Sequence, residues 1–328
     1  MASSAAPLLE VRDLRKYFPV RKGLFSRTTG HVHAVDGISF SIAKGETLGL
    51  VGESGCGKST AGKAILKLID PTSGEVRLRG ERIDGLSRAA MRPHRRALQV
   101  VFQDPYSSLN PRLRAGDIVA EPLRNYERLS AAEGRSNVAW LFDKVGLRPD
   151  QMVKFPHEFS GGQRQRLGIA RALALRPELI VCDEPVSALD VSIQAQIINL
   201  LMRLQREFNL SLIVISHDLS VVRQISHRVL VLYLGRVMEI GTRDELYAGP
   251  RHPYTQALIS AVPIPDPDRE ANKPRMTLTG DPPSPFEPPS GCLFRTRCPK
   301  ATALCAETAP PEDRVSESHR VFCHHWRE

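Results

Sequence analysis

The residues best suited to chemistry in this sequence form the glycine-rich run GESGCGKST at residues 52–60. The run fits the pattern G-x-x-x-x-G-K-S/T and lies between an apolar segment and a helical one. Glycines let successive backbone N–H groups face phosphate oxygens, Lys58 can reach the β and γ phosphates, and the Ser59 hydroxyl can ligate Mg²⁺. We therefore predict a phosphate-binding loop for ATP and Mg²⁺. Its predicted contacts are Gly52, Ser54, Gly55, Gly57, Lys58, Ser59 and Thr60.

A second candidate site is LIVCDEP at residues 179–185. Its four apolar residues predict a buried strand that ends in two acids. Asp183 at the end of this strand can hold Mg²⁺ through water, and Glu184 is placed to polarise an attacking water as a general base. Adjacent acids at a strand end are common on protein surfaces, but a phosphate-binding loop in the same chain favours a role in hydrolysis.

The elements around these residues alternate between strands and helices, which is typical of an α/β domain. We predict strands at residues 46–51, 98–102, 179–182 and 211–215, and helices at about 58–68, 160–175 and 193–208. From about residue 105 to residue 160 the polarity rises and helical patterns dominate, which indicates a helical insertion between two parts of a sheet. No internal repeat is present in the sequence.

Composition limits the class of protein. The chain has 328 residues, 41% hydrophobic and 25% charged, which describes a globular protein rather than a disordered or disulfide-dense one. The net charge of +9 lies wholly before residue 251, because the remaining segment holds 10 basic and 10 acidic residues. That segment also contains 13 of the 25 prolines and four of the six cysteines. We therefore predict a boundary near residue 250, with domains at 1–250 and 251–328.

The basic charge leaves three kinds of partner open: nucleic acid, a membrane-proximal surface and phosphate-bearing ligands. No segment approaches the ~18 consecutive apolar residues of a spanning helix. The first residues, MASSAAPLLEVRDL, lack the charged and apolar regions of a signal peptide. We therefore expect a cytoplasmic protein that meets a membrane only through partners.

Several further motifs resemble those of the ATP-binding cassette (ABC) ATPases. The run FSGGQRQR at residues 159–166 resembles their signature motif, with Phe159 where leucine is more usual. Gln103 resembles the glutamine of their Q-loop, SALD at 187–190 their D-loop, and His217 their switch histidine. The order and spacing match from residue 8 to about 245. The resemblance implies an α/β P-loop NTPase of ABC type: a RecA-like core with an antiparallel β subdomain, a helical insertion, and a small Cys/Pro-rich C-terminal tail domain.

The resemblance also implies a mechanism. Two such domains pair head to tail, so the signature residues would serve the ATP held by the partner's phosphate loop. His217 would contact the γ-phosphate, and Gln103 would contact Mg²⁺ or water. An aromatic residue ahead of the loop would stack on adenine, with Phe18 as the candidate and Tyr17 as the alternative. The signature and D-loop residues implied to contact nucleotide are Ser160, Gly161, Gly162, Gln163 and Asp190.

A finer resemblance is to the ATPases of oligopeptide and dipeptide importers, including relatives that handle nickel. Four stretches carry it: YFPVRKGLF (17–25), GESGCGKST, QDPYSSLNPR (103–112) and RHPYTQALISAVP (251–263). It implies the second of the two ATPase subunit types, peripheral on the cytoplasmic face of the bacterial inner membrane. Its implied partners are another ATPase subunit, two transmembrane permeases and, through them, an extracytoplasmic peptide-binding protein.

The tail cysteines are spaced C-x5-C-x6-C-x17-C, and they are Cys292, Cys298, Cys305 and Cys323. In a cytoplasmic chain four clustered thiols indicate a metal rather than disulfides. Four thiolates suit Zn²⁺ or an iron–sulfur cluster, and the resemblance favours a 4Fe-4S cluster. His319, His324 and His325 could substitute as ligands, although we favour their being exposed polar residues near the terminus.

Two alternatives compete with an importer ATPase. One is a soluble ABC ATPase that acts on nucleic acid or the ribosome, suggested by the basic charge. Such relatives usually carry two cassettes or a long coiled-coil insertion, and this sequence has neither. The other is a cassette that binds ATP without hydrolysing it, which is disfavoured by the presence of Lys58, Asp183, Glu184 and His217.

Overall fold

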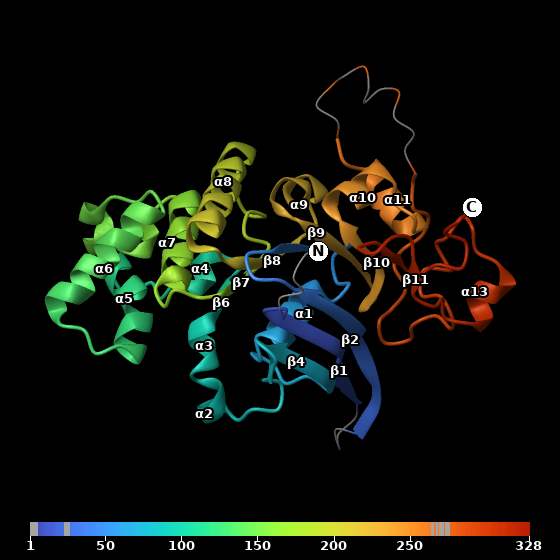
Figure 1. The fold of residues 1–328 in the computed structure, drawn as a ribbon, viewed down its shortest axis with the longest axis horizontal. Helices are drawn as coiled ribbons and strands as arrows, with labels where there is room; N and C mark the ends of the chain where they lie inside the picture. Colours follow the sequence, from blue (N-terminus) through green and yellow to red (C-terminus); the bar gives the residue numbers. More distant parts are fainter. Residues whose placement is uncertain (1–5, 23–26, 264–265, 267, 269–271, 273–275) are drawn as a thin grey trace. The chain divides into compact units, whose positions relative to one another are not determined.

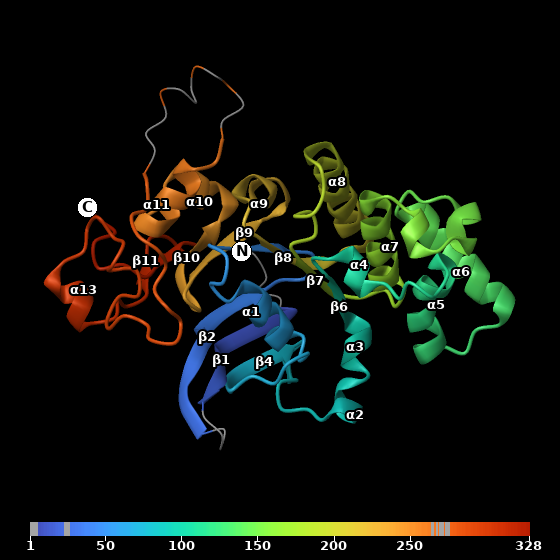
Figure 2. The same ribbon diagram turned by 180° about the vertical axis from the view of Figure 1, so that it is seen from behind.

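The computed structural model describes residues 6–328 except 23–26, 264–265, 267, 269–271 and 273–275. The start of the segment considered for a signal peptide and the end of YFPVRKGLF therefore lie outside the described residues. The chain divides into two compact units (Figures 1 and 2). The first consists of Met1–Ala43, Thr47–Gly85 and Ser216–Glu328, and the second of Lys44–Glu46 and Leu86–Ile215.

The first unit contains a four-stranded antiparallel sheet in the order β2-β1-β4-β5. Its strands are β1 (Leu9–Lys22), β2 (Arg27–Ile42), β4 (Ser73–Leu78) and β5 (Glu81–Arg82). Val11 and Leu14 of β1 are both buried although they are three residues apart. A bulge between them, with Asp13 at φ +43°, returns the side chains of the strand to the core face. Helix α1 (Lys58–Ile65) packs against β1 and β2.

The second sheet of this unit contains the strand that leads into the glycine-rich run. That strand is the wholly buried β3 (Thr47–Val51), which pairs in parallel with β9 (Arg228–Tyr233). Beyond β9 the order is β10 (Arg236–Thr242), β12 (Arg320–Val321) and β11 (Asp313–Arg314), all antiparallel. After Ser216, the described helices of this unit are α9 (Leu219–Ile225), α10 (Arg243–Ala248), α11 (Pro253–Ser260) and α13 (Ala303–Glu307).

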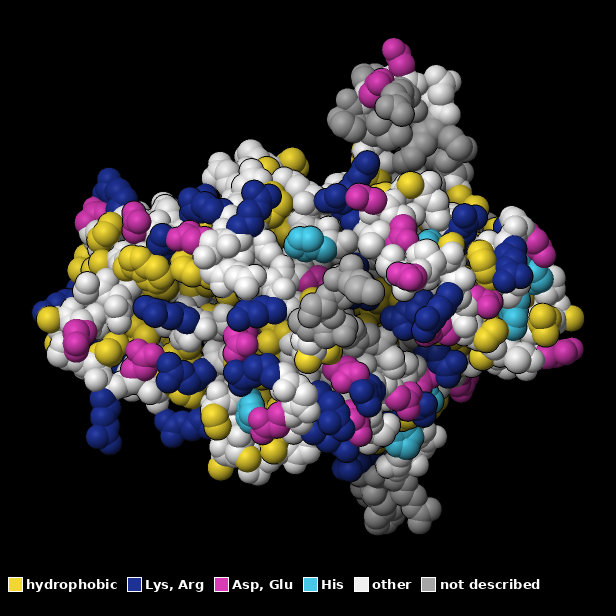
Figure 3. All heavy atoms as spheres, viewed as in Figure 1, with side chains coloured by type: hydrophobic (Ala, Val, Ile, Leu, Met, Phe, Trp, Pro, Cys, Tyr) yellow, Lys and Arg dark blue, Asp and Glu magenta, His cyan; other side chains and the backbone are white. Residues whose placement is uncertain are grey.

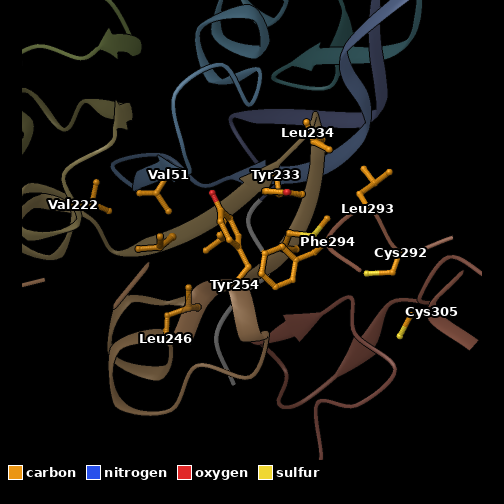
Figure 4. Close-up of a cluster of buried hydrophobic side chains, with 13 residues drawn as sticks. Val51, Val222, Tyr233, Leu234, Leu246, Tyr254, Cys292, Leu293, Phe294 and Cys305 are labelled. Atoms are coloured by element: carbon orange, nitrogen blue, oxygen red, sulfur yellow. The ribbon is translucent and has the colours of Figure 1, made fainter. Parts of the chain in front are cut away.

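The proline-rich tail packs into the first unit. Strand β12 of the tail extends the second sheet by pairing with β10. Phe294 is fully buried against Tyr233 and Tyr254, with ring centres 5.3 Å from each (Figure 4). The tail, which includes α11, therefore shares a hydrophobic core with β9, which composition alone did not predict.

A buried carboxylate also joins the tail to the second sheet. Glu239 of β10 accepts hydrogen bonds from the backbone N–H groups of Arg251 and His252 at 2.7 and 2.9 Å. The Nε2 atom of His319 lies 2.6 Å from the same carboxylate. His319 is only 3% exposed, so our expectation of an exposed histidine was wrong at this position. A histidine near a terminus is buried here because Glu239 gives its ring nitrogen a partner.

The second unit contains three parallel strands in the order β8-β7-β6. They are β6 (Leu98–Val101), β7 (Leu179–Asp183) and β8 (Ser211–Ser216). Helices α7 (Gly161–Leu173) and α8 (Val191–Phe208) accompany them. The strands and helices predicted here are confirmed, with ends that differ by two residues or fewer.

The predicted helical insertion is also confirmed. Its elements are α4 (Pro105–Ser108), α5 (Ala115–Tyr126), α6 (Ala131–Lys144) and the 3₁₀ helices Pro149–Val153 and Pro156–Glu158. Two short helices, α2 (Arg88–Met91) and α3 (His94–Ala97), precede β6. A reciprocal capping box between Ser130 and Glu133 begins α6. Within the described part of the chain, no helix is long and apolar enough to cross a membrane.

Candidate functional site

Two glycines fix the path of the loop between β3 and α1. Gly52 has φ +151°, and a Cβ atom there would lie 2.2 Å from the Leu232 carbonyl oxygen. Gly57 has φ +103°, and a Cβ atom there would lie 1.9 Å from the Ala34 carbonyl oxygen. Any side chain would collide with backbone at both positions, so only glycine allows the loop to close in this form.

Lys58 is held inside this loop. Its side chain is buried, and its Nζ atom donates hydrogen bonds to the carbonyl oxygens of Gly52 and Glu53 at 2.8 and 2.9 Å. The ammonium is thus fixed beside the loop's backbone, where phosphate oxygens can compete for it. Burial raises the pKa of the neighbouring Cys56 thiol, which keeps that thiol neutral. The remaining predicted contacts are either exposed (Ser54, Gly55) or half-buried (Ser59, Thr60).

The two aromatic candidates for adenine differ in their surroundings. Tyr17 donates its hydroxyl proton to Asp36 and stacks on His33 with ring centres 4.3 Å apart. Phe18 is 40% exposed, with the Lys16 ammonium 4.9 Å from its ring centre. Phe18 is therefore not a core residue, and its ring is the more accessible of the two for stacking on a base.

His217 directly follows β8 and is exposed. The next residue, Asp218, begins α9 by accepting a hydrogen bond from the Ser220 backbone N–H at 2.7 Å. His217 thus lies between the end of a buried strand and a capped helix, in the first unit together with the phosphate-binding loop and Phe18.

In the second unit the structure brings Gln103 and Glu184 together. The Gln103 amide donates a hydrogen bond to the Glu184 carboxylate at 2.8 Å. Glu184 has φ +46°, a conformation that is rare for residues other than glycine, and its backbone N–H bonds to the Ile215 carbonyl at 2.9 Å. Asp183 ends β7 and is 8% exposed. Backbone strain beside paired polar side chains is typical of a functional site.

The signature residues form a capped helix start. The Ser160 hydroxyl accepts from the Gln163 backbone N–H at 3.3 Å, and the Gln163 side chain accepts from the Ser160 N–H at 3.0 Å. Leu189 of the D-loop and Ile193 of α8 lie close to the two glycines between Ser160 and Gln163. A Cβ atom at Gly161 would lie 3.2 Å from Leu189, and one at Gly162 would lie 2.5 Å from Ile193. Asp190 directly precedes α8 and is exposed.

Sequence reasoning missed one residue that joins two of these motifs. Arg164 is buried, donates to the Pro156 carbonyl at 2.7 Å, and places its guanidinium carbon 3.7 Å from the ring centre of Tyr106. Tyr106 belongs to the QDPYSSLNPR stretch, in which Asp104 caps α4. The cation–π contact therefore ties the signature helix to the segment that follows Gln103. Arg164 stands within the signature motif, but its partner could not be inferred from spacing.

The predicted site residues are thus divided between the two units. Those of the phosphate-binding loop, Phe18 and His217 belong to the first unit, and Gln103, Asp183, Glu184, the signature residues and Asp190 belong to the second. The roles assigned to these residues in binding or hydrolysing ATP stay predictions. That Ser59 and Asp183 share one Mg²⁺ stays a prediction.

The four tail cysteines, all of which the structure describes, are not arranged as a metal site. Cys292 and Cys305 are buried in the core cluster, and the Cys292 N–H bonds to the Cys305 carbonyl at 2.8 Å. Burial raises the pKa of the Cys323 thiol to about 11, with smaller contributions from the other three thiols. The four are free of disulfides. Among the described residues, no group of three or more His, Cys, Asp or Glu side chains is placed to hold a metal ion.

Comparison with known proteins identifies the family. The ABC transporter family matches residues 35–187, and the oligopeptide/dipeptide transporter C-terminal region matches residues 238–305. The oligopeptide transport ATP-binding protein AppF of Bacillus subtilis is 54% identical over 324 residues, which cover 98% of each chain. The corresponding protein OppF of Salmonella typhimurium is 55% identical over 319 residues, covering 96% of this chain and 95% of that one. The chain belongs to this family of ABC transporter ATP-binding proteins.

Solved structures agree with the family assignment. The cassette CbiO1 of Clostridium perfringens, part of an ABC transporter complex, has a TM-score of 0.64 and 29% identity over 74% of this chain and 91% of that chain. A dimeric ATP-binding cassette in a post-hydrolysis state with ADP and phosphate has the same TM-score and identity over 72% of this chain and 98% of that chain. The ABC fold predicted from the motifs is confirmed.

We predict that Gly57→Ala lowers the affinity of the full-length chain for ATP by about tenfold or more. A left-handed conformation costs an alanine about 1–2 kcal/mol, and the clash with the Ala34 carbonyl adds to this cost. Equilibrium titration with ATP and Mg²⁺ measures the effect. Gly134→Ala in α6 is the control, because a Cβ atom there meets nothing within 4 Å. Wild-type affinity in Gly57→Ala would contradict the role of this glycine.

Proposed function

We propose that this chain is the ATP-hydrolysing subunit of an ABC importer for oligopeptides or dipeptides, of the second ATPase type. The observation that carries the proposal is the near full-length identity of 54–55% to oligopeptide transport ATP-binding proteins, which includes the tail as well as the cassette. The intact glycine loop around a buried Lys58 and the pairing of Gln103 with Glu184 support ATP hydrolysis.

The residues present fit a role in hydrolysis of ATP with Mg²⁺. Glu184 would act as the general base on the attacking water, oriented by its hydrogen bond from Gln103. Ser59, Gln103 and Asp183 offer oxygen ligands, which Mg²⁺ prefers, and the bound ion would neutralise phosphate charge. His217 would contact the γ-phosphate, and the exposed ring of Phe18 would stack on adenine.

The signature helix supports pairing with a second ATPase subunit. Ser160 is exposed at the N-terminus of α7, a helix of 13 residues whose dipole favours an anion at that end. In a head-to-tail pair this end would face the γ-phosphate held by the partner. The solved relative with ADP and phosphate is a dimeric ATP-binding cassette.

The remaining partners follow from the proposed family role. Residues 1–250 would form the nucleotide-binding domain, with residues of about 105–160 as its helical subdomain, and residues 251–328 would form the tail domain. The assembled ATPase pair would lie on the cytoplasmic face of the inner membrane, peripheral to two transmembrane permeases. A peptide-binding protein would deliver the solute to these permeases from outside.

Nothing in the comparisons supports the alternative of a nucleic-acid or ribosome-acting ATPase. On the face drawn in Figure 3, Lys and Arg side chains are interspersed with Asp and Glu rather than gathered into one continuous basic surface. Nucleic-acid binding by electrostatics needs clustered cations that replace condensed counterions. The +9 charge is more simply explained by a polyanionic nucleotide and a membrane-proximal partner.

We predict that the chain restores peptide uptake to a deletion strain, whereas Glu184→Gln does not. Loss of the general base should reduce ATP hydrolysis by about 10²-fold or more while leaving ATP binding intact. Uptake of labelled peptide and phosphate release from the purified transporter measure the two effects. Asp143→Asn, an exposed carboxylate on α6, is the matched control and should behave as wild type. A deletion strain with unaltered peptide uptake would contradict the importer assignment.

We also propose that Cys292, Cys298, Cys305 and Cys323 bind a metal, a 4Fe-4S cluster before Zn²⁺. Their number and spacing support this proposal, and binding would require the thiols to move together and lose their protons. We expect about four irons per chain in anaerobically purified protein, and loss of the metal in Cys298→Ser with Cys182→Ser as the control. Protein that carries neither iron nor zinc would refute the proposal.

A further inference from the structure

Glu53, the second residue of the glycine-rich run, connects the phosphate-binding loop to the tail. Its carbonyl oxygen accepts a hydrogen bond from the Lys58 ammonium at 2.9 Å. Its backbone N–H donates to the Tyr254 hydroxyl at 2.8 Å. Its carboxylate accepts two hydrogen bonds from the Arg297 guanidinium, at 2.6 and 3.0 Å. One residue thus contacts both the lysine of the loop and two residues of the chain beyond position 250.

The ion pair between Glu53 and Arg297 is partly shielded from water. The Arg297 side chain is 5% exposed and that of Glu53 is 27% exposed. Both oxygens of the carboxylate are engaged, in the two-pronged geometry that makes arginine–carboxylate pairs strong and directional. Such a pair is screened less by salt than a surface ion pair.

A rigid aromatic cluster holds Arg297 and Tyr254 in place. The rings of Tyr233, Tyr254 and Phe294 contact one another with centres 4.8–5.3 Å apart (Figure 4). The Arg297 guanidinium lies 6.0 Å from the centre of the Tyr233 ring, and its backbone N–H bonds to the Phe294 carbonyl at 3.0 Å. The aromatic cluster therefore packs beside the guanidinium that binds Glu53.

The charge of Glu53 explains why such a partner matters. A carboxylate in a phosphate-binding loop repels a polyanion, and this repulsion is strongest where the site is poorly screened. A bidentate guanidinium neutralises the carboxylate and fixes its direction. It also holds Glu53 in place, and the carbonyl oxygen of Glu53 accepts a hydrogen bond from the Lys58 ammonium.

We propose that Arg297 is a positioning residue of the nucleotide site, which acts through Glu53 to raise the affinity of the loop for the phosphates of ATP. The tail thereby contributes to nucleotide binding in its own chain. This inference rests on the proposed ATP site in the loop, but not on the identity of the transported solute.

A double-mutant cycle on the full-length chain tests this inference. We expect Arg297→Met to weaken ATP binding by about tenfold, because it leaves the Glu53 carboxylate uncompensated beside the phosphates. Glu53→Gln in the same chain removes that carboxylate, so Arg297→Met/Glu53→Gln should bind ATP within about threefold of Glu53→Gln alone. Since repulsion grows with phosphate charge, Arg297→Met should weaken ATP binding more than ADP binding.

The controls separate this role from simple unfolding and from failure of the proposed site. Arg295→Met removes a nearby tail arginine whose hydrogen bonds go to Ser290, and it should leave ATP affinity unchanged. Lys58→Ala should abolish binding if the loop is the ATP site, and unchanged binding in this variant would refute the proposed function itself. The positioning role is overturned if Arg297→Met binds ATP normally. It is also overturned if Arg297→Met weakens the binding of ATP and ADP equally and the added Glu53→Gln change does not restore ATP affinity.

Discussion

The shape of the phosphate-binding loop depends on two backbone carbonyl oxygens that stand where side chains would otherwise be. Those of Leu232 and Ala34 exclude any residue but glycine at Gly52 and Gly57. The Gly235 N–H, in the turn after β9, bonds to the Cys56 carbonyl at 2.9 Å and closes the loop from the same side. The loop is thus shaped by neighbouring strands as well as by its own sequence.

Charge compensation is the second constraint on the site. The Lys58 ammonium is buried among backbone carbonyl oxygens. The Glu53 carboxylate is paired with Arg297 rather than with Lys58. Glu184 accepts a hydrogen bond from the neutral amide of Gln103, which can orient its carboxylate toward an attacking water. Each charged group therefore has a partner that suits its role in binding or hydrolysing ATP.

The local features could be predicted from the sequence, because they depend on short spacings. The glycine loop, the strand that ends in Asp183, the capped signature helix and the helical insertion all lie where periodicity and motifs indicated. The contacts that the tail makes with the rest of the first unit could not be predicted in this way. Glu53 and Arg297 are 244 residues apart, and nothing local marks them as partners. His319 was expected at the surface because its position near the terminus gives no sign of the buried Glu239.

Because Arg297 binds Glu53, the tail and the phosphate-binding loop should respond to nucleotide together. Hydrogen–deuterium exchange of the full-length chain, with and without ATP and Mg²⁺, tests it most directly. We predict slower exchange at residues 52–58 and, in the same titration, at residues 292–298, because Glu53 and Arg297 are joined by a partly buried ion pair. Slower exchange in the loop with an unchanged tail at saturating ATP would contradict the claim.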